Sequence, residues 1–162
     1  MKRVTAFIVC VLLAGFTEHT ITAVQGDKAP DNATLLRQGF AEVSGWITTA
    51  AQAVPADKYT YRPTKDVRTF GELIGHIADG HNFYCSRAAG KRVEWSDAVA
   101  KGATDKATLA SQLKAATGVC SAAHGGASAG SPLLIQNYGH TNLHYGNVIT
   151  YMRMLGLKPP SS

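Results

Sequence analysis

The chain has 162 residues and a formal net charge of +5, with 45% hydrophobic and 17% charged residues. This length is typical of a single domain, and this balance of apolar and charged residues excludes an intrinsically disordered chain. The basic residues are scattered along the sequence instead of forming a patch, so we do not expect a nucleic-acid-binding surface.

The N-terminal segment 1–23 has the pattern of an export signal. Two cations precede an apolar run over 4–16, which is about 13 residues long and therefore too short to cross a bilayer comfortably. Ala23 is a small residue suited to cleavage, although Ile21 is unusual two positions before it. We therefore expect a cleaved signal peptide, a short polar leader over 24–31, and a protein that is periplasmic or secreted. An uncleaved N-terminal anchor is the alternative.

Apolar side chains recur at three- and four-residue spacing in four segments of the mature chain, which predicts four amphipathic helices. A capping residue, Asp31 or Asn32, precedes the first helix, and Pro55 ends it. Thr69 and Glu72 have the spacing of a capping box at the start of the second helix. The expected helices cover 32–54, 69–89, 104–123 and 133–155.

The connections between these helices are expected to be loops. The segment 55–68 contains two prolines, 90–102 carries Trp95, and His124 begins the glycine-rich sequence HGGASAGSP. No strand pattern, internal repeat or second domain is evident. Because each helix has one apolar face, the four bury these faces best as an all-α four-helix bundle over 32–158.

Two histidines, His140 and His144, lie four residues apart in the last predicted helix. Four residues lift a helix by about 6 Å and turn it by roughly 400°, so both rings leave the same face, which continues with apolar residues. His76 lies among inward residues of the second helix, whereas His81 should face elsewhere. These three inward histidines could form a divalent metal site if the two helices are neighbours. The alternative is a set of buried histidines that hydrogen-bond locally.

Polar side chains near a metal site usually orient the free nitrogens of its histidines. Asp79 and Asn137 stand one helical turn from two of the three histidines, although an exposed carboxylate and a local polar group are their more ordinary roles. Tyr84 and Tyr145 would line the mouth of the site, unless they are core aromatics. No Ser-His-Asp or Cys-His set is evident, so the catalytic residues stay unassigned.

Export would make the cysteine count informative, because disulfides persist in oxidising compartments. Cys10 lies inside the expected signal, which leaves Cys85 and Cys120, each near the C-terminal half of a predicted helix. A disulfide between them would tie two helices together and contribute roughly 3–4 kcal/mol to stability. Two separate buried thiols are the alternative.

The segment FGELIGHIADGHNFYC and the C-terminal segment HTNLHYGNVITYMRMLGLKPPSS resemble the DinB/YfiT-like superfamily. The segment PADKYTYRPTKDVRTFGEL also looks like exported bacterial members. The resemblance implies a four-helix bundle that holds a divalent metal ion with one histidine from the second helix and two from an HxxxH pair in the last. The positions that match this pattern are His76, His140 and His144.

The resemblance also implies the class of activity. Some members look like metal-dependent transferases of low-molecular-weight thiols, or isomerases and hydrolases that use such thiols. We therefore expect a metal-dependent transferase or hydrolase with Zn²⁺, Ni²⁺, Fe²⁺ or Mn²⁺ and a low-molecular-weight thiol. A non-catalytic module that binds the metal or a small ligand is the alternative. The expected partner is a small-molecule substrate, with no nucleic acid and no stable membrane span after signal cleavage, and a homodimer is left open.

Overall fold

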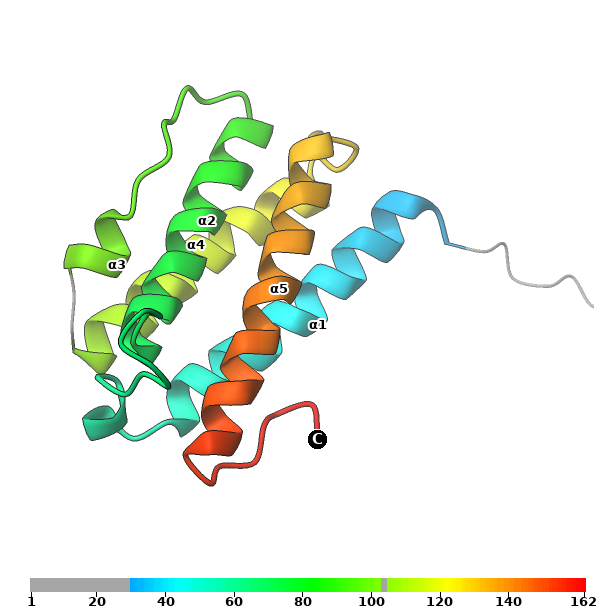
Figure 1. Cartoon of the computed structure of the whole chain (residues 1–162). Helices are drawn as coiled ribbons and strands as arrows, with labels where there is room; N and C mark the ends of the chain where they lie inside the picture. Colours follow the sequence, from blue (N-terminus) through cyan, green and yellow to red (C-terminus); the bar gives the residue numbers. More distant parts are fainter. Residues whose placement is uncertain (1–29, 103–104) are drawn as a thin grey trace, which may run out of the picture.

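The computed structural model describes residues 30–102 and 105–162, so the expected signal peptide over 1–23 lies outside the described residues. Within these two ranges the protein is helical and contains no strand, which confirms the predicted all-α class. No helix in the described ranges is both long and apolar enough to cross a membrane. The helices are α1 (Asn32–Ala53), the 3-10 turn η1 (Ala56–Lys58), α2 (Phe70–Ala88), α3 (Ala98–Gly102), α4 (Lys106–Gly125) and α5 (Pro132–Met154) (Figure 1).

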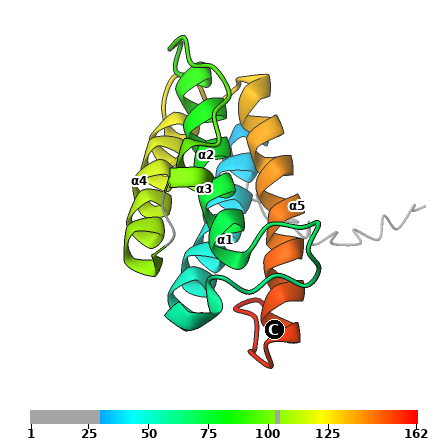
Figure 2. The same cartoon turned by 60° about the vertical axis from the view of Figure 1, so that its left-hand side comes forward.

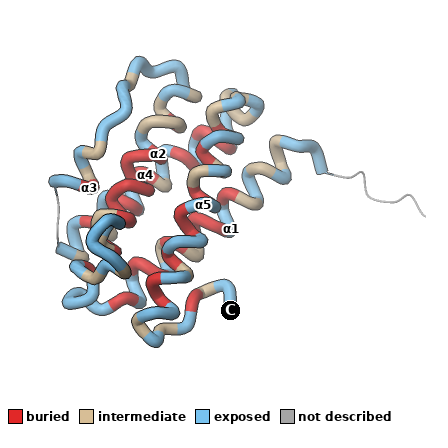
Figure 3. Tube along the Cα trace, in the orientation of Figure 1, coloured by how far each residue is buried: buried red, intermediate tan, exposed pale blue. Residues whose placement is uncertain are grey.

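The four long helices form a bundle in which each packs against two others. The helix α2 contacts both α4 and α5, and α1 contacts the same two helices. The short helix α3 lies beside α2 (Figures 1 and 2). Buried residues gather along the inward sides of the long helices (Figure 3). This arrangement makes α2 and α5 neighbours, which is the condition that a site shared by their histidines requires.

Side-chain caps start the four long helices close to where the sequence predicts, and three of them show the pattern clearly. The carboxylate of Asp31 accepts a hydrogen bond from the amide of Thr34 at 2.8 Å. Thr69 and Glu72 form both hydrogen bonds of the predicted capping box. Asp105 caps α4 in the same way as Asp31 caps α1. Each cap gives a partner to an amide that the first turn of a helix leaves without one.

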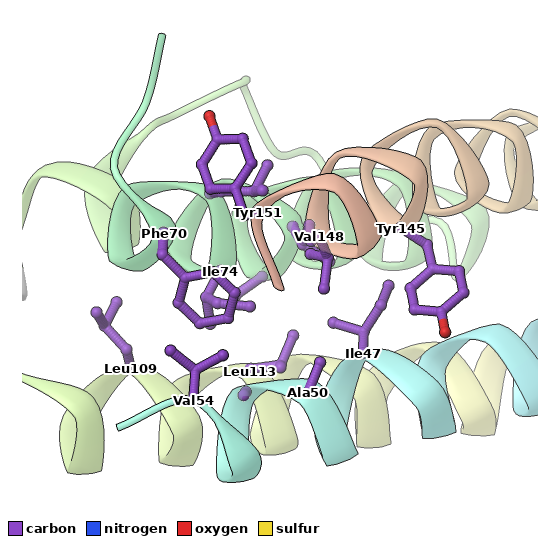
Figure 4. Close-up of a cluster of buried hydrophobic side chains, with 14 of the residues drawn as sticks. Ile47, Ala50, Val54, Phe70, Ile74, Leu109, Leu113, Tyr145, Val148 and Tyr151 are labelled. Atoms are coloured by element: carbon purple, nitrogen blue, oxygen red, sulfur yellow. The ribbon is translucent and has the colours of Figure 1, made fainter. Parts of the chain in front are cut away.

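The core fills the space between the four long helices. A smaller apolar cluster beside it contains the disulfide between Cys85 of α2 and Cys120 of α4. The disulfide therefore joins two helices that already pack against each other. Figure 4 labels ten members of the main core: Ile47, Ala50, Val54, Phe70, Ile74, Leu109, Leu113, Tyr145, Val148 and Tyr151.

The segment 90–102, which we expected to be a loop, ends in α3. The carboxylate of Asp79 accepts hydrogen bonds from the amides of Val99 and Ala100, both at 3.0 Å, and so gives partners to two amides at the start of this helix. Gly75 permits the close approach, because a Cβ there would lie 2.6 Å from the Cα of Ala100. A five-residue helix is too short to produce a periodic pattern, which is why the sequence does not reveal it.

The expectation that His124 begins a loop is wrong. His124 lies in the last turn of α4 and is 1% exposed. Its ring stacks on Phe40 of α1 with a centroid distance of 4.4 Å, and the ring of His81 of α2 forms a T-shaped pair with the same phenylalanine at a centroid distance of 5.4 Å. Packing of the imidazole against α1 extends α4 into the start of the glycine-rich segment.

We expect the stability of the metal-free protein to fall as the pH drops from 7 to 5. His81 is fully buried, and this burial lowers its pKa to about 4. Between this value and the pKa of about 6.5 in the unfolded chain, the unfolded state binds more protons than the folded state, so stability decreases with falling pH. The contribution of His81 at pH 5 is a loss of about 2 kcal/mol.

Urea denaturation at several pH values, with a chelator present, measures this dependence. His81→Gln is expected to be less stable than the wild type at pH 7, because it loses the contact with Asn137, but to show a shallower pH dependence. Parallel pH profiles for the two proteins would show that His81 is not the group that titrates.

Candidate metal centre

Three histidine rings from two neighbouring helices meet in one place. His76 comes from the middle of α2, and His140 and His144 come from successive turns of α5. The Nε2 atoms of His76 and His140 are 3.3 Å apart. The ring centroid of His144 lies 4.7 Å from that of His76 and 4.4 Å from that of His140. One ring nitrogen of each of the three residues lies within 4.8 Å of the other two nitrogens. The structure therefore brings together the three histidines that the sequence singled out.

The three rings fit a divalent metal ion. In a tetrahedral zinc site with Zn–N bonds of about 2.0–2.1 Å, two ligand nitrogens stand roughly 3.3 Å apart, which matches the separation between His76 and His140. A donor set made only of imidazoles suits zinc and other first-row transition metals. A hydrogen bond between these two rings is the alternative, but it would leave the nearby ring of His144 without a role.

Burial keeps the three rings neutral, which metal binding requires. It is the largest cause of the lowered pKa of His140, about 3, and of His144, about 4. Burial also lowers the pKa of His76, although the neighbouring Asp97 opposes this shift. Near pH 7 each imidazole is therefore uncharged and has one nitrogen lone pair available for a cation.

Asp97 orients the ring of His76. Its Oδ1 lies 3.3 Å from Nδ1 of His76, and this hydrogen bond is the main cause of the lowered pKa of the Asp97 carboxyl. Because an ionised carboxylate only accepts hydrogen bonds, Nδ1 carries the proton and Nε2 directs its lone pair towards the other histidines. Asp97 directly precedes α3, and Asp79 fixes the start of that helix, so Asp79 also helps to position Asp97.

Asn147 occupies the corresponding position beside His144. Its side-chain Nδ2 lies 3.3 Å from Nδ1 of His144. Only the amide turned by half a rotation, with its oxygen towards the ring, would accept a hydrogen bond from Nδ1–H and leave Nε2 free to bind a metal ion. A carboxylate therefore selects the tautomer of His76, and an amide contacts the ring of His144.

The two side chains that we expected to orient the histidines bind elsewhere. Asp79 accepts hydrogen bonds from backbone amides of α3. Asn137 has its Oδ1 3.1 Å from Nδ1 of His81, and its amide group donates to the sulfur of Cys120 at 3.5 Å. It belongs to a separate buried polar cluster with His81 and Cys120. The side chains that contact ring nitrogens of His76 and His144 in their place are Asp97 and Asn147.

Aromatic side chains cover the cluster. The indole of Trp95 lies 5.4 Å from the ring of His76 and 6.0 Å from that of His140, and Tyr84 lies 5.7 Å from His140. Tyr84 therefore borders the site, as the sequence suggested. Tyr145 does not, because it stacks against α1 and donates a hydrogen bond to the C-terminal tail. The segment 90–97, which was expected only to connect two helices, contributes both an aromatic cover and the carboxylate of Asp97.

A pocket of about 680 Å³ opens beside His144. Asp97 and Asn147 also line it, and the segment 62–68 forms much of its wall. The histidine cluster is therefore connected to a space large enough for a small molecule. A ligand in this pocket can approach the cluster from the side of His144.

We expect Gly80→Ala to disturb the histidine cluster. Gly80 lies on α2 directly beside the ring of His140, and a Cβ there would lie 2.7 Å from its Nδ1. Because this contact is too short, the ring has to move. We expect divalent ions to bind at least about 10-fold more weakly, which is the loss typical of a metal ligand whose orienting hydrogen bond has been removed. Competition with a chromophoric chelator measures the affinity.

Gly45→Ala is the matched control for this variant, because a Cβ at Gly45 would meet no neighbouring atom within 4 Å. It should leave the affinity for the ion unchanged. An unchanged affinity in Gly80→Ala as well would show that the position of His140 is not important for binding.

The fold and the site together define a helical-bundle protein with a three-histidine cluster between two neighbouring helices. The model of the DinB superfamily matches residues 47–129, just over half of the chain, and the chain belongs to this superfamily. The matched range contains His76, whereas His140 and His144 lie beyond it. No curated protein and no solved structure matches the chain.

Proposed function

We propose that this protein is an exported metalloenzyme of the DinB type. It holds one divalent ion with His76, His140 and His144 and catalyses nucleophilic attack on a small molecule, in a thiol transfer or a hydrolysis. The observation that carries the proposal is the convergence of three neutral imidazoles beside an open pocket. No fourth histidine, cysteine or carboxylate joins the group in the part of the chain that the structure describes. Three protein ligands with an open position are typical of catalytic metal sites.

The side chains around the cluster have distinct tasks in this proposal. A bound Zn²⁺, Ni²⁺, Fe²⁺ or Mn²⁺ would supply Lewis-acid chemistry that lowers the pKa of a water molecule or a thiol. Asp97 keeps the proton on Nδ1 of His76, and Asn147 orients His144. Trp95 covers the cluster and limits the access of water from that side.

Export to the periplasm or the medium is part of the proposal. The pattern of residues 1–23 supports it, as does the disulfide between Cys85 and Cys120, because structural disulfides persist in oxidising compartments and are rare in the cytosol. A low-molecular-weight thiol would then act outside the cytoplasm.

Activity assays of the metal-loaded protein test this function. The assays combine a small thiol with 1-chloro-2,4-dinitrobenzene for transfer, and use p-nitrophenyl acetate for hydrolysis. We expect turnover in at least one assay, its loss with a chelator, its recovery when the ion is added back, and no turnover by His144→Ala. Stoichiometric ion binding without turnover in either assay would favour a non-catalytic binding module.

A further inference from the structure

The pocket beside the histidine cluster is lined by basic side chains. We infer that the substrate carries a carboxylate or phosphate group, which Arg68 binds while the reacting group of the same molecule reaches the metal position beside His144. This inference rests on the proposed function, because it assumes a metal ion at the cluster. To that function the inference adds the charge of the substrate and the residue that recognises this charge.

Four cationic side chains line the pocket, and two of them already have acidic partners. Arg62 lies 3.5 Å from Glu72, and Lys101 lies 3.7 Å from Asp97. These two cations are therefore partly neutralised. The lining cations that have no ion pair with another described residue are Lys65 and Arg68.

The acidic residues of the pocket are mostly occupied by other contacts. Asp97 lies against His76, and Glu72 accepts a hydrogen bond from the amide of Thr69 in the capping box of α2. Asp66 is the remaining acidic residue in the lining. The pocket therefore keeps a surplus of positive charge, and a divalent ion at the histidines would increase it. Such a surface attracts anions.

Arg68 is better placed than Lys65 to bind an anion at a fixed distance from the cluster. Its carbonyl accepts a hydrogen bond from the hydroxyl of Tyr151 on α5 at 2.9 Å, and it directly precedes Thr69, the cap of α2. Figure 2 shows the segment before α2 extending across α5. The planar guanidinium of arginine matches the oxygens of a carboxylate or a phosphate.

Arg68 and His144 line the same pocket of about 680 Å³. One small molecule in this pocket can therefore contact both the guanidinium of Arg68 and the position beside His144.

Two thiols that differ in one group test the inference in the cobalt-loaded protein. 3-Mercaptopropionate and 3-mercapto-1-propanol both present a thiol to the ion, and binding is followed by the sulfur-to-cobalt absorption band. Only the first has a carboxylate for Arg68. We expect the wild type to bind 3-mercaptopropionate about 10-fold more tightly than the alcohol, which is the difference that one hydrogen bond to a charged group produces. This preference should weaken in high salt.

Arg68→Gln is expected to keep one cobalt ion per chain and to lose the preference for the carboxylate. Arg37→Gln, which changes an exposed arginine of α1 outside the pocket, should retain it. Equal binding of the two thiols by the wild type, or a preference that survives Arg68→Gln, would overturn the inference and leave the metal centre intact. If neither thiol produces the absorption band, the proposed metal function fails and the inference fails with it.

Discussion

Replacing His76 with alanine is expected to reduce the bound divalent ion from one per chain to almost none after dialysis. His76 is the only one of the three histidines that α2 contributes, so its loss leaves two ligands on one helix. Because the loss of a single orienting contact around a metal ligand costs about 10–100-fold in affinity, the loss of a ligand should cost more than about 100-fold. Metal analysis of the purified protein measures the content, and His140→Ala and His144→Ala should behave in the same way.

His81→Gln is the control for this series. His81 is a buried histidine of the same helix, but it contacts Asn137 and Phe40 instead of the cluster. Its replacement should lower stability and leave the ion content at one per chain, as long as circular dichroism shows a folded helical protein. Equal ion content in His81→Gln and in all three alanine variants would contradict the site.

Of all the substitutions considered, removal of the disulfide is expected to cause the largest loss of stability. Cys85 and Cys120 are separated by 35 positions and are both fully buried. In the unfolded chain the bridge restricts a loop of this length, and its removal should cost about 3–4 kcal/mol. The double variant Cys85→Ala/Cys120→Ala should therefore unfold at a much lower urea concentration than the oxidised wild type, with the helical content retained in the absence of urea.

Val119→Ala is the control for the disulfide. Val119 precedes Cys120 but is 39% exposed, so its replacement should change the free energy of unfolding by less than about 1 kcal/mol. A double cysteine variant as stable as Val119→Ala would show that the bridge contributes little to the folded state.

The local features of the fold could be predicted from the sequence because their causes are local. The capping box at Thr69 and Glu72, the cap at Asp31 and the stop near Pro55 each depend on residues within one helical turn. The short helix α3 was missed because it depends on Asp79, which lies about 20 residues earlier in the chain. His124 was misplaced because its ring packs on Phe40 of a distant helix.

The three histidines could be predicted as ligands, but their convergence could not. Spacing places His140 and His144 on one face of α5, whereas nothing in the sequence requires that α2 be a neighbour of α5. The resemblance to a known superfamily supplied this relation, and the structure shows it directly.

The side chains that orient the histidines were missed for two different reasons. Asn147 had a readable signal, since it follows His144 by three residues and so lies on the adjacent turn of the same helix. Asp97 had no such signal in the sequence. It lies 21 positions after His76, in a connection that has no periodic pattern of apolar residues. Tertiary contacts of this kind require a structure.

The central claim is that three imidazoles from two helices bind one ion. Anomalous diffraction at the zinc edge, from crystals grown with Zn²⁺, tests it most directly. We predict one strong peak at about 2.0–2.1 Å from one ring nitrogen of each of His76, His140 and His144. A zinc-containing crystal with no peak at this position, in which the three rings hydrogen-bond only to each other, would contradict the claim.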